Sequence, residues 1–199
     1  NTLAVGWAPF GGLHINVNLK AKEEKEVTFV LGYCDDMGKE EKVFEKYSKK
    51  GAVDQELKTL AGYWENNLQK YQCETPDPTV NSMVNVWNQY QCMTTFNWSR
   101  SASYYEAGGE RGMGFRDSNQ DTLGFVHMIP NKVHDRLVDI ASVQFPEGRA
   151  HHGYSPLTKK GSREGYGDDH LWLVQAVHNY IKETGDIRFL DEIVPYNDG

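Results

Sequence analysis

The chain has 199 residues, of which 39% are hydrophobic and 25% are charged, and its formal net charge is −7. This composition is typical of a soluble globular protein. No run of Lys and Arg is dense enough to follow a phosphate backbone, and no apolar run approaches the roughly 20 residues that span a bilayer, so we expect neither nucleic acid nor membrane as a partner.

Residues 1–10 contain neither a basic segment nor an apolar segment of the kind found in secretory signals. We therefore expect a signal to be absent or already removed, and the start indicates a cut from something longer. The three cysteines, Cys34, Cys73 and Cys92, have no C-x-x-C spacing, and their odd number argues against a disulfide framework. A reducing, cytoplasmic location fits best.

Aromatic residues make up 12% of the chain, including 5 Trp and 11 Tyr, many of them beside polar residues. Exposed aromatic rings stack on sugars, but the same residues also fill ordinary protein cores. Both interpretations remain open from composition.

Residues 13–19 alternate between apolar and polar side chains, and residues 26–33 contain a β-rich run, so each predicts a strand. The charged segment 20–25 between them predicts a turn. Because two strands cannot bury a sheet face by themselves, we expect them to belong to a larger β domain.

From Lys39 the hydrophobic period changes to that of a helix. Apolar side chains at intervals of three or four predict a linker helix of about 18 residues; they are Val53, Leu57, Leu60, Trp64 and Leu68. A second helix is expected to begin at Pro78 with Asp77 as its N-cap, which indicates a domain boundary near residue 75.

Three further helices are predicted, over residues 117–128, 132–145 and 169–183. The last is apolar on most faces, which predicts an element covered by neighbours on several sides. A Gly-rich stretch at 108–114 and a polar loop at 148–167 separate the helices, and loops of this length are usually functional.

The first candidate site lies around the Gly-rich stretch, where Arg100, Arg111 and Arg116 accompany Asp117 and several glycines. Arginines and carboxylates bind hydroxyls in fixed geometry, and glycine allows a ligand to approach the backbone, so the mixture suits polyol recognition. The alternative is an ion-pair network in which Asp117 only caps the following helix.

The second candidate is the pair Asp168 and Asp169 before the last helix. Adjacent carboxylates could supply a general acid, but a helix cap with a favourable dipole contact explains them more simply, and we favour the cap. The histidines lack the spacing of known metal ligands and Gly112-x-Gly114 lacks a third glycine, so neither a metal nor a dinucleotide is expected.

Several longer runs carry a resemblance to a known family. They are residues 86–93 (Val-Trp-Asn-Gln-Tyr-Gln-Cys-Met), 96–104 and 111–118 (Arg-Gly-Met-Gly-Phe-Arg-Asp-Ser), with shorter runs at 123–127, 156–159, 168–173 and 180–186. These runs resemble the cellobiose phosphorylase family of inverting disaccharide phosphorylases. The resemblance is strong over residues 80–195 and looser over the first 75.

The resemblance implies a multidomain α and β fold. Residues 1–35 would be the end of an antiparallel β-sandwich, residues 36–75 a helical linker, and residues 76–199 the first part of an (α/α)6 barrel catalytic domain. The family's general acid, in a Trp-Asn-Asp motif, and its phosphate-binding loop are both expected beyond residue 199. The intact protein is expected to be a homodimer.

The resemblance also implies an activity. The intact protein would cleave a β-linked glucosyl disaccharide, most simply cellobiose, with inorganic phosphate to give α-glucose 1-phosphate and a free sugar; phosphate is a substrate, and no cofactor is implied. By motif match, Arg100, Arg111 and Asp117 would bind the glucosyl group, with Arg116 beside them. No proton transfer is carried over to the pair of aspartates before the last helix.

Two loops, residues 150–155 and 162–167, depart from the family's pattern and leave the acceptor sugar open. Two other functions also stay open. One is a non-catalytic glucan-binding protein that shares the barrel, and the other is a glucoamylase-like hydrolase on the same toroid, which would need a second carboxylate to activate water.

Overall fold

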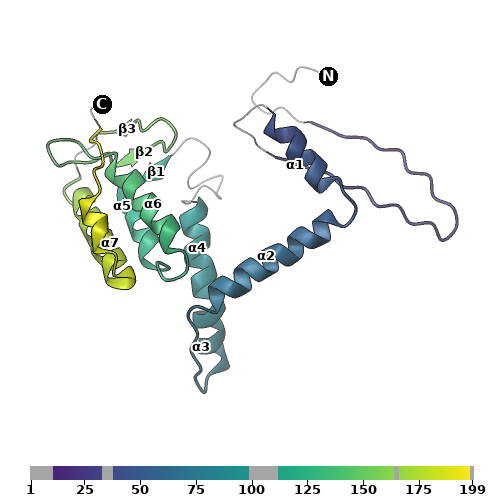
Figure 1. Ribbon diagram of the computed structural model, residues 1–199, viewed down its shortest axis with the longest axis horizontal. Helices are drawn as coiled ribbons and strands as arrows, with labels where there is room; N and C mark the ends of the chain where they lie inside the picture. The colour runs from purple at the N-terminus through teal and green to yellow at the C-terminus, as the bar shows by residue number, and fades with distance from the viewer. Residues whose placement is uncertain (1–10, 33–37, 99–111, 164–165, 198–199) are drawn as a thin grey trace. The chain divides into compact units, whose positions relative to one another are not determined.

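The computed structural model describes residues 11–32, 38–98, 112–163 and 166–197. The chain divides into two compact units, residues 1–59 and 60–199. The described part is mostly helical, and the second unit contains a small antiparallel sheet of three short strands (Figure 1).

Residues 11–32 of the first unit form an extended chain that turns between Lys20 and Glu23. The Glu23 N–H donates to the Lys20 carbonyl oxygen at 3.0 Å, so the turn expected from the charged segment is present. The strands expected at 13–19 and 26–33 are not formed in the part that is described. A two-stranded ribbon is marginal by itself, because it leaves its apolar side chains uncovered.

Two helices follow, α1 (Lys39–Tyr47) and α2 (Ala52–Leu68). The 17 residues of α2 confirm the helix predicted from the apolar stripe. Lys46 Nζ lies 2.8 Å from Glu56 Oε1. Because Lys46 is exposed and Glu56 is only partly buried, solvent screens this ion pair and it contributes little to stability.

The next helix is continuous but not uniform. It comprises α3 (Pro78–Ser82), a π-helical turn η1 (Met83–Trp87) and α4 (Asn88–Trp98). The Asp77 carboxylate accepts from the Thr79 N–H at 2.8 Å, which confirms the predicted start. The π turn was not predicted, because the apolar spacing of this segment suits an α-helix equally well.

Three amides on this helix hold the preceding segment in place. Asn85 exchanges two hydrogen bonds with the backbone of Cys73, both 2.8 Å long. Asn81 exchanges two hydrogen bonds with the backbone of Thr75 in the same way. Gln89, which is buried, donates to the Tyr71 carbonyl oxygen at 2.9 Å. These contacts satisfy the backbone of a segment that has no regular structure of its own.

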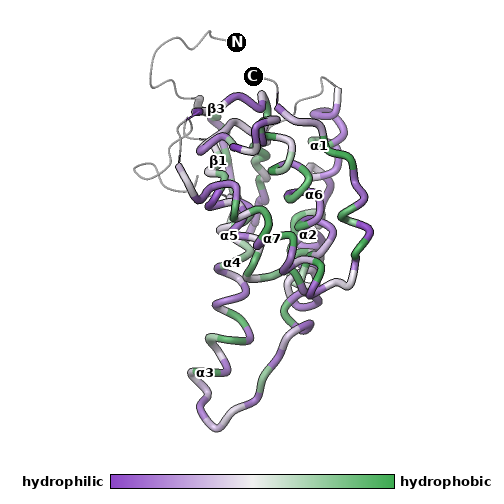
Figure 2. Tube along the Cα trace, turned by 90° about the vertical axis from the view of Figure 1, so that its left-hand side faces the viewer, coloured by the Kyte–Doolittle hydropathy of each residue, from purple (hydrophilic) through white to green (hydrophobic). Residues whose placement is uncertain are grey.

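The core of the second unit lies between α4 and three later helices, α5 (Phe115–Leu123), α6 (Pro130–Ala141) and α7 (Asp169–Thr184). Its central hydrophobic side chains are less than 5% exposed: Met93, Phe96, Phe115, Phe125, Val126, Met128, Val133, Leu137, Ile140, Val143, Tyr154, Ala176 and Tyr180. The hydrophobic residues that recur along α6 and α7 are green in Figure 2.

The helix predicted over 117–128 ends early, at Leu123. The chain then forms a turn, in which the Met128 N–H donates to the Phe125 carbonyl oxygen at 2.9 Å and both side chains are completely buried. The Phe125 ring meets the ring of Phe96 edge-on at 4.8 Å between centroids. These side chains therefore join the core from a turn and not from the predicted helix.

The sequence correctly predicted where α7 begins and ends, but the prediction that neighbours cover it on several sides was wrong. Leu173, Ala176 and Tyr180 form its buried face, whereas Leu171 and Val174 are 58% and 68% exposed. In this chain the helix is therefore covered on one side, by α5 and α6. It ends at Gly185 and is followed by a 3-10 turn, η2 (Ile187–Asp191).

The sheet joins three short strands, β1 (Met113–Gly114), β2 (Gly153–Tyr154) and β3 (Gly161–Ser162), in that order. Gly114 pairs with Gly153, which in turn pairs with Ser162. A Cβ atom at Gly161 would lie 2.0 Å from the Gly153 carbonyl oxygen, so the strands approach too closely for any side chain there. The sheet links the two long loops that sequence analysis marked as functional.

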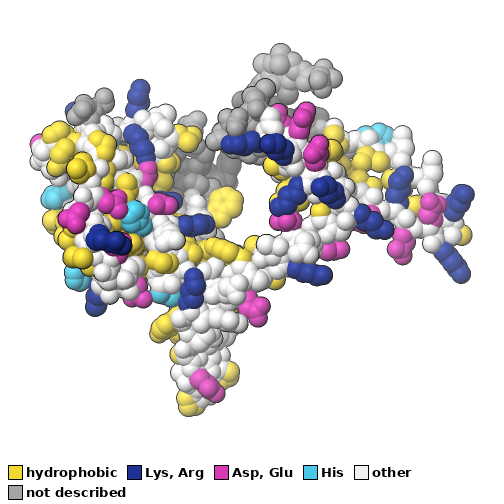
Figure 3. Space-filling view, in the orientation of Figure 1, with side chains coloured by type: hydrophobic (Ala, Val, Ile, Leu, Met, Phe, Trp, Pro, Cys, Tyr) yellow, Lys and Arg dark blue, Asp and Glu magenta, His cyan; other side chains and the backbone are white. Residues whose placement is uncertain are grey.

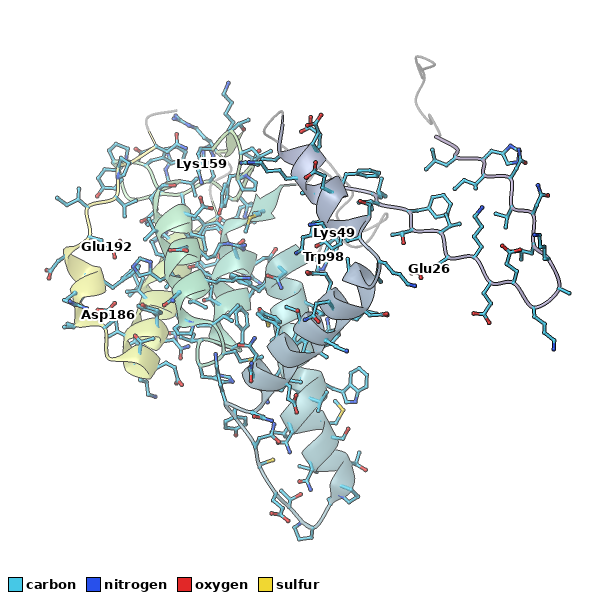
Figure 4. The ribbon with its side chains drawn as sticks, turned by 45° about the vertical axis from the view of Figure 1, so that its right-hand side comes forward. Glu26, Lys49, Trp98, Lys159, Asp186 and Glu192 are labelled. Atoms are coloured by element: carbon cyan, nitrogen blue, oxygen red, sulfur yellow. The ribbon has the colours of Figure 1, made fainter. Side chains whose placement is uncertain are left out.

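Two polar contacts tie the turn between β2 and β3 to α6. The Tyr154 hydroxyl donates to Asp139 Oδ2 at 3.1 Å, and Lys159, labelled in Figure 4, forms an ion pair with the same carboxylate. Burial of the phenol raises the pKa of Tyr154 to about 12. The turn is thus anchored at both ends.

On the face drawn in Figure 3, acidic, basic and histidine side chains are interspersed. Cys73 and Cys92 carry free thiols. Within the described ranges, no helix is both long and apolar enough to cross a membrane.

Candidate functional site

Asp117 lies in the first turn of α5, directly after β1. It is partly buried, and its carboxylate folds back over Gly114: a Cβ atom at that glycine would lie 2.7 Å from Asp117 Oδ2. The positive end of a helix favours a negative charge in this place. The sequence therefore presents a carboxylate at the N-terminus of α5, held against a residue that lacks a side chain.

Arg116, the neighbouring residue, points elsewhere. Its Nη1 donates to Asp168 Oδ2 at 3.4 Å, and its guanidinium lies over the Trp172 ring at 5.7 Å. The Trp172 Nε1–H donates to the same carboxylate oxygen at 3.2 Å. Asp168 thereby links Arg116, in the first turn of α5, to Trp172, near the start of α7.

These contacts keep Asp168 ionised. The hydrogen bond from Trp172, reinforced by the adjacent Arg116, lowers the pKa of this carboxyl below its usual value. Asp168 occupies the N-cap position of α7 as predicted, but its side chain makes no capping hydrogen bond. The carboxylate does not cap the helix because it accepts instead from the Arg116 guanidinium and from the Trp172 indole N–H.

Asp169 has a different environment from its neighbour. Only 3% of it is exposed, and Oδ2 accepts from His152 Nδ1 at 3.0 Å. Its other oxygen, Oδ1, is buried and has no hydrogen-bond partner in the part of the chain that the structure describes. The predicted role in the helix dipole fits its place at the start of α7, but the contact with His152 was not predicted.

Backbone hydrogen bonds bring these residues to one end of the helices. The Phe115 N–H, at the start of α5, donates to the His152 carbonyl oxygen at 2.9 Å. The same residue, which directly precedes β2, contacts Asp169 of α7 through its ring. The N-termini of α5 and α7 therefore both contact His152.

The structure describes only two of the four predicted site residues. Arg100 and Arg111 lie outside the described residues, so their expected meeting with Asp117 stays a prediction. Asp117 and Arg116 are described, and they lie at the N-terminus of α5 with their side chains engaged differently.

Three residues of this cluster were missed, His152, Tyr166 and Trp172. The His152 ring stacks on Tyr166 with 3.9 Å between centroids and 24° between planes. The available signal was the position of these residues: each lies in or just after a long polar loop that ends at a helix start. Sequence reasoning treated the histidine as a possible metal ligand and as part of a loop that departs from the family's pattern, but it assigned no sugar contact to it.

The arrangement can bind a ligand that carries many hydroxyls. It offers ionised carboxylates as acceptors, a guanidinium as donor, and exposed ring faces for stacking. Two helix N-termini add a positive potential. Within the described residues there is no group of His, Cys, Asp and Glu that could hold a metal ion.

Comparison with known families identifies the family of the chain. The profile described as "Glycosyl hydrolase 94 superfamily, catalytic domain" matches residues 63–199, and "Glycosyl hydrolase 94, supersandwich domain" matches residues 1–50. The chain belongs to the glycosyl hydrolase 94 family. This confirms the family resemblance that the motifs around Asp117 predicted.

Sequence alignments with individual relatives include almost the whole length of this chain. An N,N'-diacetylchitobiose phosphorylase of Vibrio furnissii is 32% identical over 95% of this chain and 26% of its own length. The cyclic beta-(1,2)-glucan synthase NdvB of Rhizobium meliloti is 34% identical over 94% of the chain and 6% of its own length. A solabiose phosphorylase of Paenibacillus borealis is 27% identical over 100% of the chain and 24% of its own length. The chain thus spans about a quarter of the length of the phosphorylases it matches.

Proposed function

We propose that the full-length protein is an inverting phosphorylase that cleaves a β-linked disaccharide with inorganic phosphate. The observation that carries this proposal is the carboxylate of Asp117, held over Gly114 at the start of α5 in a chain that belongs to the glycosyl hydrolase 94 family. The names of several relatives, which are disaccharide phosphorylases, support it.

The chemistry needs few groups. An inverting hydrolase uses one carboxylic acid to protonate the leaving oxygen and a second carboxylate to deprotonate water. Phosphate is already an anionic nucleophile, so a phosphorylase needs only the acid. Attack from the face opposite the leaving group converts the β-linkage into an α-sugar 1-phosphate.

In this proposal the candidate site residues of this chain bind the sugar and do not transfer its protons. Asp117 accepts from two adjacent hydroxyls of the glycosyl group, while Arg100 and Arg111 fix the ring. Arg116 is half exposed, and its remaining N–H groups can reach a hydroxyl while it holds Asp168. Because its pKa is lowered, Asp168 serves as an acceptor and not as the general acid.

The larger architecture is part of the same proposal. Residues 1–35 would complete a β-sandwich, residues 36–75 would link it, and residues 76–199 would begin an (α/α)6 barrel. The general acid and the phosphate-binding residues would lie elsewhere in the full-length protein. A cytoplasmic homodimer remains our expectation for the assembled enzyme.

Cellobiose is the substrate that we propose first, since the motifs around Asp117 resemble those of a glucosyl-binding site. N,N'-diacetylchitobiose is the second candidate, because two relatives at 32% and 30% identity are phosphorylases named for it. The loops at 150–155 and 162–167 are where we expect the difference between acceptor sugars to be set.

The test is to incubate the full-length protein with each β-linked disaccharide, with and without phosphate, and to measure sugar 1-phosphate. We expect phosphate-dependent release of an α-sugar 1-phosphate from at least one of them. Cleavage that does not depend on phosphate would instead identify a glucoamylase-like hydrolase. Sugar binding without any cleavage would identify a glucan-binding protein.

A further inference from the structure

We propose that His152 is a sugar-binding residue: its Nε2 accepts a hydrogen bond from a hydroxyl of the bound glycosyl group, and Asp169 holds it in the tautomer that allows this. The inference rests on the proposed function, because it adds a contact between that site and its substrate. No motif of the sequence assigned this role.

The buried carboxylate determines which ring nitrogen carries the proton. An ionised carboxylate can only accept, so the 3.0 Å contact between His152 Nδ1 and Asp169 Oδ2 places the proton on Nδ1. In a neutral imidazole the other nitrogen, Nε2, is then an acceptor. Asp169 Oδ1 has no hydrogen-bond partner among the described residues, so His152 is the side chain that bonds to this carboxylate in the described part of the chain.

The ring is also fixed in its plane. It stacks on Tyr166 at 3.9 Å, and both side chains remain partly exposed. Within the described residues, Nε2 of His152 makes no hydrogen bond to the protein. An acceptor that is already oriented loses little entropy when a ligand binds, which is the property of a binding residue.

The position of His152 relates it to the predicted sugar-binding residues. Its carbonyl oxygen accepts from the N–H of Phe115, which lies two positions before Asp117. Its ring contacts the first residue of α7, next to Asp168, which bonds to Arg116. His152 thus lies between the two helix N-termini that carry the other polar groups of the site.

A structural role would predict something else. If the contact between His152 and Asp169 only fastened β2 to α7, its loss would lower stability and leave the affinity for sugar unchanged in the folded protein. A binding role predicts lower affinity at unchanged folding, because a buried or oriented acceptor discriminates strongly for a hydroxyl.

The experiment measures sugar affinity in the full-length protein by calorimetric titration with cellobiose and with N,N'-diacetylchitobiose, beside phosphate-dependent turnover. His152→Ala is expected to weaken binding about tenfold, which is typical for one lost hydrogen bond. The matched control is His178→Ala, an exposed histidine on α7, which is expected to bind as the wild type does. Melting temperature reports folding for each variant.

Two conservative variants separate the nitrogens of the ring. His152→Gln places an amide oxygen near the position of Nε2 and is expected to retain most of the affinity, whereas His152→Asn reaches only the position of Nδ1 and is expected to bind like the alanine variant. Asp169→Asn is expected to weaken binding as well, because an amide N–H directed at Nδ1 moves the ring proton to Nε2.

The outcomes distinguish this inference from the activity on which it rests. An active wild type in which His152→Ala matches His178→Ala in affinity and turnover would overturn the inference and leave the activity. A wild type that binds sugar but releases no sugar phosphate, and loses affinity in His152→Ala, would overturn the activity and support the inference. A wild type that binds neither sugar would overturn both.

Discussion

Gly112 and Gly114 flank the same methionine, but each is glycine for its own reason. Gly112 has a φ of +63°, and a Cβ atom there would lie 2.4 Å from the Tyr154 carbonyl oxygen. Gly114 has an ordinary φ of −73°, and its Cβ would meet the Asp117 carboxylate. The first glycine is therefore required by the backbone and the second by the side chain of Asp117.

The two glycines should respond differently to alanine. We expect Gly112→Ala to lower the free energy of unfolding by about 1–3 kcal/mol, through backbone strain and displacement of β2. Gly114→Ala should change stability little but lower kcat/KM, because the new methyl group displaces the Asp117 carboxylate. Urea unfolding and initial rates of sugar phosphate release measure the two effects; the reverse pattern would contradict this assignment.

Asp117 itself gives the sharpest test of the sugar-binding site. Two hydrogen bonds from hydroxyls to a charged acceptor contribute together about 3–5 kcal/mol, so Asp117→Ala should lower kcat/KM roughly 100-fold or more. The melting temperature should stay close to that of the wild type. Asp191→Ala, which removes an exposed carboxylate from η2, serves as the control. Lost activity together with a collapsed melting transition would show that Asp117 is structural.

At the scale of elements, a histidine ties α6 to the segment that follows α7. His134 Nε2 lies 2.6 Å from Glu192 Oε1, and Nδ1 lies 3.3 Å from Asp135 Oδ1; Glu192 is labelled in Figure 4. Burial lowers the pKa of His134, but the hydrogen bonds with Glu192 and Asp135 outweigh it, and the net pKa is raised.

The sign of the pH dependence follows. A histidine whose pKa is raised by folding stabilises the protein fully below its unfolded value of about 6.5, and this contribution is lost as the pH rises through the folded value. Wild type and Glu192→Gln should therefore differ in free energy of unfolding below pH 6.5 and converge above the raised pKa of His134. Urea unfolding at several pH values tests this; a difference that is constant with pH would contradict it.

Local signals predicted most of the helices. The Asp77 cap, the stripe on α2 and the stop at Gly185 each involve neighbouring residues, so sequence alone places them within a residue or two. The strands β1, β2 and β3 have two residues each, too few to display a period. The pairing of β1 with β2 joins residues about 40 positions apart, which no local pattern records.

At the scale of the whole molecule, the family was within reach of sequence and the geometry of the site was not. Motifs identified the family over both of its matched domains and selected Asp117 and Arg116 as candidates. They did not reveal that Arg116 bonds to Asp168, or that the adjacent Asp169 is buried against His152. Adjacent aspartates of similar appearance acquire different partners because a helix turns their side chains to different sides.

The π turn at Met83–Trp87 has a consequence for the length of this region. A π turn contains one residue more than an α turn, but both complete about one rotation around the helix axis. Deleting one residue within Met83–Trp87 would therefore convert η1 into an ordinary α turn and leave the Asn81 side of the rod aligned with the face that carries Met93. A deletion within α4 would instead rotate the two sides by about 100° relative to each other, so we expect natural variants of this helix to lose a residue within η1 far more readily than within α4.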